Sequence, residues 1–490
     1  MSADSTLAAD KRVLLARLEP IGQEHLLAFW DELAPADRRQ LAEQIQSIDV
    51  DVFRQLQAEH QRSLGAGKNE QSHWADLAAR AQSPPAMRLD GSGVNFTKDQ
   101  ARQRGSEMLR AGEIGMILVA GGLGTRLGFD QPKGMFRLGP LSNRPLFQIL
   151  IEQLRAVGRR YSVSIPLYIM TSPATDGITR TFLSENAWFG MRESDVCIFC
   201  QGTMWAIDDQ WQRILLESKS SLFLGPDGHG GMLAALHKSG SLADAEKRGV
   251  KHFFYAQIDN PLTQVCDELF LGCHALAGSE MTTQVVRKRE PLERVGNVVS
   301  IDGRMQVIEY SDLPDESARQ TAADGSLKLW AGNLAIHVMD AEFLGRCAKN
   351  ADALPFHKAH KKVPHIDSAG RLIEPEKPNA IRFERFIFDL LPHAKSAVAL
   401  EVDPAEAFAP VKNSDDEKTD NPRTARAAMI ALHTRWLREA GVEVAAGVSV
   451  EINPLWAANA DEVAARATPG LRVSQPTYFA ESGPQVISGT

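Results

Sequence analysis

Three glycines, an arginine and a lysine within residues 117–135 are the strongest candidates for chemistry in this sequence. Gly121, Gly122 and Gly124 follow an apolar run, and without a Cβ they let backbone N–H groups come close to an anion. Arg126 and Lys133 add two positive charges where phosphoryl oxygens would lie. The segment therefore predicts a cradle for a triphosphate. A plain glycine turn beside a surface arginine and lysine is the alternative.

The spacing of these glycines excludes two common motifs. The dinucleotide fingerprint needs a third glycine three positions after Gly122-x-Gly124, and that position is Leu127, so the fingerprint is incomplete. The sequence also contains no Gly-x-x-x-x-Gly-Lys-Ser/Thr, so no Walker P-loop is present.

Other polar residues follow apolar runs further along the chain. Gln201 offers an amide that could pair with a base edge, or could simply hydrogen-bond at a strand end. A second glycine-rich loop at residues 225–231 opens a helix, whose positive end suits an anion. His229 in that loop could contact a sugar or phosphate, or only solvent. Asp259 precedes Asn-Pro and could bind Mg²⁺, although turn capping would explain it as well.

The elements that must position these residues alternate between apolar runs and helical stretches. We expect strands at residues 114–119, 166–171, 196–201, 252–257, 281–286 and 335–338, helices at 146–158, 232–239 and near 424–439, and a hairpin at 296–310. This order predicts an α/β fold: an open, mostly parallel, Rossmann-like sheet with helices on both faces. Ligands of such sheets bind at the carboxyl ends of the strands, where the Gly121 loop lies.

The length of 490 residues exceeds the usual size of a single hydrophobic core, so more than one domain is expected. Helical periodicity fills the beginning of the chain, and a break follows Pro392. We predict a helical N-terminal region at residues 1–95, a central α/β domain at 96–395 and a small C-terminal domain at 396–490.

Composition restricts the class of protein. The 54 basic and 62 acidic residues give a net charge of −8, which argues against a nucleic-acid or membrane-surface binder. The start of the chain lacks the apolar region of a signal peptide, and no apolar run reaches membrane-spanning length, so we expect a soluble, cytoplasmic protein. Five cysteines fit a reducing compartment. Cys197 and Cys200 lie in an apolar run, which predicts two buried strand cysteines rather than a metal site.

Taken together, the motifs resemble the UTP:sugar-1-phosphate uridylyltransferase family (UDPGP type 1), and most closely its UDP-N-acetylglucosamine pyrophosphorylase branch. The matching stretches lie in the same order over residues 112–430. They are the glycine loop with Pro-Lys-Gly-Met, Pro-Asp-Gly-His-Gly-Gly, Ile-Asp-Asn, Val-Ile-Glu-Tyr-Ser, Ala-Gly-Asn, the segment from Lys377 to Asp389, and Pro-Val-Lys-Asn with Asn-Pro-Arg-Thr-Ala-Arg.

The resemblance implies a role for each matching residue. The residues it implies for catalysis, through positive charge around the reacting phosphates, are Arg126, Lys133 and Lys412. The residues it implies for nucleotide binding are Val119, Ala120, Gly121, Gly122, Gly124, Thr125, Gln201, Gly228, Asp259 and Arg382. Asp259 would also carry Mg²⁺, the one expected cofactor. The residues it implies for sugar binding are His229, Gly296, Glu309, Tyr310, Asn333, Phe386 and Phe388.

The function implied is that of an enzyme, a nucleotidyltransferase that makes a UDP-sugar and pyrophosphate from UTP and a hexose-1-phosphate. N-acetylglucosamine-1-phosphate is the first choice. The alternatives are a UDP-glucose or UDP-galactose pyrophosphorylase, or a regulatory protein that binds UDP-sugars without turnover. Two residues depart from the branch: His229 replaces its usual asparagine, and Arg382 replaces a family lysine. The partners expected are therefore two small molecules, with no nucleic acid and no membrane, and the oligomeric state stays open.

Overall fold

The computed structural model describes residues 11–65, 70–350, 353–468 and 470–487. The chain divides into two compact units, each built from separate segments of sequence. The first unit takes the chain up to Asp76, Gly202–Gly231 and Leu354–Ile387, and the second takes Leu77–Gln201, Met232–Ala353 and Phe388 onward. The three consecutive domains expected from the sequence remain a prediction.

A large mixed sheet forms the centre of the second unit. Its strands run in the order β1-β21-β13-β16-β12-β2-β5-β6, and every neighbouring pair along this path is parallel except the two pairs made by β16. The strands are β1 (Ala86–Met87), β2 (Ile114–Val119), β5 (Leu167–Thr171), β6 (Val196–Cys200), β12 (His252–Gln257), β13 (Met281–Arg287), β16 (Ala331–Asp340) and β21 (Ala397–Glu401). The predicted mostly parallel α/β sheet is confirmed.

Continuous apolar runs explain the middle of this sheet. Phe253, Phe254 and Tyr255 in β12 have no exposed surface, and neither do Ile117 and Leu118 in β2. Strands that are covered on both faces lack the alternation of apolar and polar residues that a half-exposed strand shows. The register pairs Gln257 with Val119, so β2 and β12 end at the same edge of the sheet.

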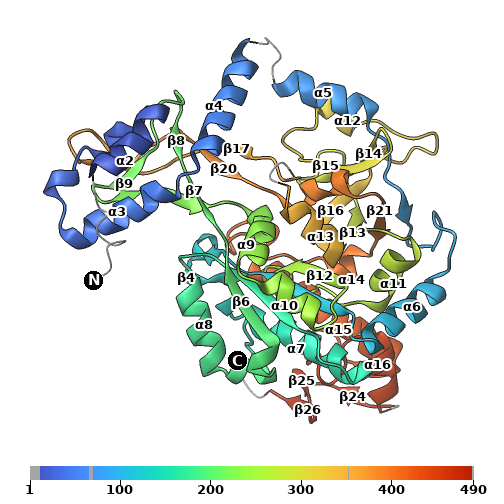
Figure 1. Ribbon diagram of the computed structural model, residues 1–490. Helices are drawn as coiled ribbons and strands as arrows, with labels where there is room; N and C mark the ends of the chain where they lie inside the picture. The colour runs from blue at the N-terminus through green and yellow to red at the C-terminus, as the bar shows by residue number, and fades with distance from the viewer. Residues whose placement is uncertain (1–10, 66–69, 351–352, 469, 488–490) are drawn as a thin grey trace. The chain divides into compact units, whose positions relative to one another are not determined.

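Helices α6 (Lys98–Arg110), α7 (Leu146–Tyr161), α8 (Asp176–Glu185), α9 (Met232–Lys238), α10 (Ser241–Lys247), α11 (Glu268–Leu276), α13 (Ala341–Ala348) and α15 (Pro422–Glu439) belong to the second unit. Figure 1 shows α6 beside α11, and two glycines make this approach possible. A Cβ on Gly105 would lie 2.0 Å from the carbonyl oxygen of Glu268, and one on Gly272 would lie 1.6 Å from that of Ala101.

The hairpin expected from Asp302-Gly303 is present. β14 (Asn297–Ile301) and β15 (Arg304–Ile308) pair antiparallel across a two-residue turn. Asp302 has φ of 52° and Gly303 has φ of 79°, the left-handed pair that a type I′ turn requires. A further three-stranded sheet, β23 (Val450–Ile452), β25 (Thr477–Ala480) and β26 (Gly483–Val486), lies near the end of the chain.

The first unit combines the N-terminal helices with short strands. Helices α2 (Lys11–Leu18), α3 (Pro35–Ser47) and α4 (Val50–Gly65) confirm the helical character predicted for this region from residue 11 onward. They share an apolar core with the strands β7 (Thr203–Trp205), β8 (Ile207–Asp208) and β20 (Ala380–Glu384). Phe383 packs in this core against Trp205 and Trp211, with ring centroids 5.0 and 5.6 Å away.

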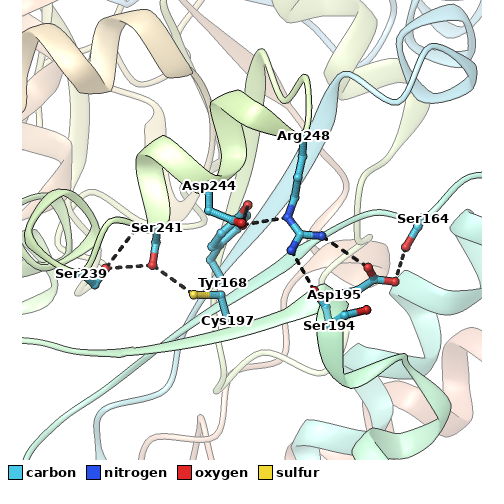
Figure 2. Close-up of polar contacts among 9 residues, drawn as sticks. All are labelled: Ser164, Tyr168, Ser194, Asp195, Cys197, Ser239, Ser241, Asp244 and Arg248. Carbon is cyan, nitrogen blue, oxygen red and sulfur yellow. Dashed lines mark hydrogen bonds and ion pairs between the residues drawn. The ribbon is translucent and has the colours of Figure 1, made fainter.

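The two strand cysteines are not buried as predicted. Both lie on β6, but Cys200 is exposed and Cys197 is half-buried. β6 is the last strand of the sheet, so it lacks a neighbour on one side. Figure 2 shows polar partners near Cys197: its sulfur lies 3.2 Å from Ser241 Oγ, and Arg248 hydrogen-bonds to both Asp244 and Asp195. Among the described helices, none combines the length and apolar character needed to cross a membrane.

Candidate active site

The first glycine loop begins where β2 ends, and Gly121 is held against the neighbouring strand. The Ser172 hydroxyl, just after β5, donates a 2.7 Å hydrogen bond to the carbonyl oxygen of Gly121. A Cβ on Gly121 would lie 3.3 Å from the Ser172 nitrogen and 3.4 Å from Gln201 Nε2, closer than most side chains tolerate. A glycine therefore fits here without displacing its neighbours, and it lies beside the Gln201 amide; the nucleotide-binding role expected for the two residues remains a prediction.

The other glycines of this loop play different parts. A Cβ on Gly124 would lie 2.7 Å from the carbonyl oxygen of Phe129, because β3 (Leu123–Gly124) folds back on β4 (Phe129–Pro132). No atom lies within 4 Å of the Cβ position of Gly122, which faces open space. The Lys133 N–H donates a 3.0 Å bond to the carbonyl oxygen of Gly122, which fixes the lysine beside the open side of the loop.

Lys133 is the electrostatic centre of the site. Burial lowers its pKa below the usual lysine value, the negative charge of Asp259 opposes this, and the positive charges of Lys412 and Arg126 act in the same direction as burial. Arg126, Lys412 and Asp259 are thus each close enough to Lys133 to act on its charge. Around Lys133, two further cations act with it against a single carboxylate, which leaves positive charge suited to an anionic ligand.

Asp259 and Lys412 meet because two segments join by their backbones. Asp259 follows β12, and its carbonyl oxygen accepts a 2.8 Å hydrogen bond from the Val411 N–H. Asn260 strengthens the joint, since its side chain donates to the carbonyl oxygen of Ala407 at 2.7 Å and accepts from the Ala409 N–H at 3.0 Å. The lysine segment is therefore carried to the edge of the sheet where β2 and β12 end.

The sequence analysis missed a carboxylate in this region. Asp420 accepts backbone hydrogen bonds from Lys412 and Asn413, at 2.7 and 2.9 Å, through its carbonyl oxygen. Burial raises the pKa of its side chain, which Lys412 and Arg289 lower and Asp259 raises. One sequence signal pointed to it: the tripeptide Asp-Asn-Pro occurs at residue 420 as well as at residue 259. Ser172 was missed as well, although it follows a predicted strand at the expected edge.

Three of the predicted sugar-binding residues come together in the second unit. The Asn333 N–H donates a 2.8 Å bond to the carbonyl oxygen of Gly296, and a Cβ on Gly296 would lie 2.9 Å from Glu309 Oε1. Asn333 Oδ1 accepts from the Thr283 hydroxyl at 3.2 Å and from the Ala335 N–H at 3.0 Å. The Asn333 side chain is thus fixed by its oxygen, and its NH₂ group supplies two donors.

The remaining predicted sugar-binding residues are dispersed over both units. Tyr310 is 49% exposed and Phe388 is 5% exposed in the second unit. His229 and Phe386 belong to the first unit, where their rings stack with centroids 5.3 Å apart. The Ile387 N–H donates to His229 Nδ1 at 3.2 Å, so the neutral ring carries its proton on Nε2.

The second glycine-rich loop is closed upon its own unit. Gly228 has φ of 84°, and its Cβ would lie 2.4 Å from the carbonyl oxygen of Arg385. A Cβ on Gly231 would lie 2.0 Å from Asp227 Oδ1. The N–H groups of Gly230 and Gly231 already donate to the carbonyl oxygens of Arg385 and Gly228, at 2.8 and 3.0 Å. These two donors are therefore used by the protein, and the anion site expected at this helix end remains a prediction.

Arg382 lies against this second loop. A Cβ on Gly225 would lie 2.7 Å from an Arg382 guanidinium nitrogen, and the same guanidinium is 3.8 Å from Glu384. Both Arg382 and Gly225 belong to the first unit, whereas Arg126, Lys133 and Lys412 belong to the second. The contact between Arg382 and the nucleotide that we expect from the sequence remains a prediction.

Comparison with known proteins gives consistent matches over most of the chain. A family model described as UTP--glucose-1-phosphate uridylyltransferase matches residues 56–453. A human UDP-N-acetylhexosamine pyrophosphorylase-like protein 1 is 37% identical over 443 residues, 88% of this chain and 86% of the relative. The UDP-N-acetylglucosamine pyrophosphorylase of Saccharomyces cerevisiae is 35% identical over 442 residues, 88% of this chain and 92% of the relative. The crystal structure of a Trypanosoma brucei uridine diphosphate N-acetylglucosamine pyrophosphorylase in complex with inhibitor has a TM-score of 0.78 and 25% identity, and covers 95% of this chain and 98% of that one.

Proposed function

Because this chain belongs to the UTP--glucose-1-phosphate uridylyltransferase family, we propose that it transfers the uridylyl group of UTP to a hexose-1-phosphate. The products are a UDP-sugar and pyrophosphate, and N-acetylglucosamine-1-phosphate is the first choice of acceptor. The observation that carries the proposal is the group of Arg126, Lys133 and Lys412 with Asp259, at the edge of the sheet where β2 and β12 end.

The reaction is an in-line displacement at the α-phosphorus of UTP. A phosphate oxygen of the sugar-1-phosphate forms a bond to that phosphorus, the bond to the bridging oxygen breaks, and pyrophosphate leaves on the opposite side. The nucleophile is already an anion at neutral pH, since the second pKa of a phosphate is about 6. The protein needs no general base, and its task is to align the reactants and to stabilise negative charge on the leaving group.

We assign that stabilisation to the three cations. Lys133 and Arg126 would contact the β- and γ-phosphates, and Lys412 would lie near the α-phosphate and the incoming sugar phosphate. Gly122 supports this arrangement, because its open side leaves room for a ligand beside the backbone of the loop. The Gln201 amide, which lies beside Gly121, would read the uracil.

Asp259 fits the requirements of Mg²⁺. Mg²⁺ that accompanies phosphates takes hard oxygen ligands, commonly one or two carboxylates with water and phosphate oxygens. The Asp259 carboxylate is partly exposed at the end of β12 and is close enough to Lys133 to influence its charge. When bound, Mg²⁺ would supply further positive charge to the triphosphate.

The choice of sugar rests on the relatives and on one histidine. Two of the relatives compared are named for an N-acetylhexosamine or N-acetylglucosamine product. His229 offers a single Nε2–H donor, where the N-acetylglucosamine branch usually has an asparagine amide. A UDP-glucose or UDP-galactose pyrophosphorylase is the second candidate, because this histidine is typical of the glucose-using relatives.

A direct assay tests the proposal. The protein is incubated with UTP, Mg²⁺ and, in separate reactions, the 1-phosphates of N-acetylglucosamine, N-acetylgalactosamine, glucose and galactose, and pyrophosphate release is measured. We expect the fastest release with N-acetylglucosamine-1-phosphate. Release with glucose-1-phosphate alone would transfer the assignment to the second candidate, and no release with any sugar would overturn the enzymatic function.

A further inference from the structure

Two histidines and an aspartate converge at the edge of the central sheet opposite the candidate active site. His252 Nδ1 lies 2.7 Å from Asp340 Oδ1, His274 Nε2 lies 2.8 Å from the same oxygen, and the two nitrogens are 3.2 Å apart. We propose that His252, His274 and Asp340 form a binding site for a divalent transition metal, with Zn²⁺ as the ion that the ligands suit best.

Three elements of the second unit bring these side chains together. His252 is the first residue of β12 and pairs in register with Asp340, the last residue of β16. His274 projects from α11 and packs edge-on against the His252 ring, with centroids 5.1 Å apart. The six residues of β12 separate this cluster from the edge at Gln257 by roughly 17 Å, so the proposed site is distinct from Asp259.

The surroundings of His274 match those of a metal ligand. The residue has no exposed surface, and its second ring nitrogen, Nδ1, lies 2.8 Å from the Thr282 hydroxyl oxygen. A histidine that binds a metal through one nitrogen commonly donates the other N–H to an oxygen, which fixes the tautomer and the ring orientation. In that tautomer the Nε2 lone pair of His274 points at the space shared with His252 and Asp340.

Without a metal, the same atoms are less well satisfied. Asp340 Oδ1 then accepts from both His252 Nδ1–H and His274 Nε2–H, which places two N–H donors 3.2 Å from each other. Burial lowers the pKa of His274, so the neutral ring that a metal requires is also the form favoured by its environment. Asp340 Oδ1 is the common acceptor for both rings, so the carboxylate already lies where a cation would be shared by all three side chains.

Ligand chemistry favours Zn²⁺ over Mg²⁺. Imidazole nitrogens suit zinc and its neighbours in the first transition series, whereas Mg²⁺ takes oxygen ligands. Ligand atoms about 2.0–2.1 Å from a tetrahedral zinc lie about 3.3 Å apart, so the two nitrogen–oxygen separations need to open by about half an ångström, while the two nitrogens are already 3.2 Å apart. The side chains of His252 and Asp340 are 17% and 29% exposed, which allows water to complete the coordination.

Metal binding is tested on the full chain, stripped with a chelator and titrated with Zn²⁺ by calorimetry. Asp259→Asn and Cys200→Ser are introduced together as a background that removes the candidate Mg²⁺ ligand and an exposed thiol. We expect one equivalent of Zn²⁺ to bind in this background and to raise the melting temperature. Co²⁺ should give the visible absorption of a four-coordinate site without a thiolate band.

Variants locate the ion. In the same background, His252→Gln and Asp340→Asn should weaken Zn²⁺ binding at least about 100-fold and abolish the thermal shift. Thr282→Val should weaken binding by about 10- to 100-fold, as expected for loss of a group that orients a ligand. Failure of the background protein to bind Zn²⁺, or binding that survives both His252→Gln and Asp340→Asn, would overturn the proposal and leave a hydrogen-bonded triad. If either ligand variant does not fold, Thr282→Val and the Co²⁺ spectrum of the background decide the question.

Discussion

The two glycine-rich loops of this chain look alike in sequence and differ in what their glycines face. In the second loop, Cβ atoms on Gly228 and Gly231 would collide with the Arg385 backbone and the Asp227 carboxylate. In the first loop, the Cβ position of Gly122 faces open space, and the N–H of Lys133 donates to the carbonyl oxygen of that same glycine. Gly228 and Gly231 pack protein against protein, as Gly124 does in the first loop, whereas Gly122 keeps one side of the first loop's backbone open.

The difference shows how a glycine motif should be interpreted. Glycine permits close approach, but the approaching group can be a ligand or another part of the chain. What distinguishes the loops is the charge beside the open space: Arg126 and Lys412 both act on Lys133 near the first loop. Density of glycine alone would have ranked the second loop higher.

The largest effect is expected from Lys133→Ala. Removal of one preorganised charge at the leaving group should lower the turnover number at least about 100-fold. UTP binding, measured by calorimetry, should change much less. Lys349→Ala, which removes an exposed lysine from the same unit, is the control and should leave turnover unchanged. Equal losses of binding and turnover, or no loss of either, would favour a UDP-sugar-binding regulator over an enzyme.

A pair of glycine substitutions tests the comparison itself. Gly231→Ala should lower the free energy of unfolding by about 1–3 kcal/mol, because the new Cβ overlaps Asp227 Oδ1. Gly122→Ala should change the free energy of unfolding by less than about 0.5 kcal/mol. It should lower kcat/KM for UTP about tenfold or more, because the methyl group occupies the space of the ligand.

Urea unfolding and UTP kinetics on both glycine variants give the answer. We expect the free energy of unfolding to fall mainly in the Gly231 variant and kcat/KM for UTP to fall mainly in the Gly122 variant. Similar stability losses in both variants would show that Gly122 is a packing position as well.

The pH profile tests the electrostatics of the first loop. A lysine is charged below its pKa, so a lowered pKa means that Lys133 loses its charge at a lower pH than the usual 10.5. kcat/KM for UTP should therefore fall on the alkaline side before pH 10.5 is reached. Lys133→Arg should move this fall upward by at least about one pH unit, since arginine keeps its charge above pH 12. If the alkaline fall in kcat/KM stays at the same pH in Lys133→Arg, another group causes it.

The smallest effect is expected at His229 in the second loop. His229→Asn replaces a single N–H donor by an amide that both donates and accepts. The ratio of kcat/KM for N-acetylglucosamine-1-phosphate to that for glucose-1-phosphate should rise up to about tenfold, the value of one neutral hydrogen bond. His357→Asn alters the other histidine ring that packs on Phe386, with centroids 4.4 Å apart, and serves as the control. A ratio that moves equally in both variants would indicate a packing effect rather than recognition of the sugar.

Long apolar runs made the central sheet predictable. β2 and β12 have the bounds expected from the sequence, because strands covered on both faces show an unbroken run of large apolar residues. The hairpin at Asp302-Gly303 followed from turn chemistry alone. In the first unit, β17 (His357–Lys361) was missed, since a strand of two histidines, two lysines and one alanine has no apolar run and depends on its partner β20.

The residues of the candidate site that lie in one short segment could be predicted from the sequence. Those that distant segments bring to the site were harder to predict. The Gly121 loop lies in one continuous segment, so the cations near it could be identified directly from the sequence. Asp420 lies within a charged stretch that has the composition of a linker, and its role depends on hydrogen bonds to Lys412 and Asn413 that only the fold provides. The division into two units could not be predicted from local sequence signals for the same reason, because each unit is assembled from segments that are far apart in sequence.

The edge position of β6 gives the protein a built-in attachment point for a reporter group. Burial raises the pKa of Cys273 to about 12, that of Cys347 to about 11, and that of Cys266 as well. These three thiols therefore resist alkylation at neutral pH. Cys200 is exposed and directly precedes Gln201, whose amide lies beside Gly121. A fluorophore attached there would sense the loop from one residue away, and its emission could follow the arrival of UTP in real time without any engineered cysteine.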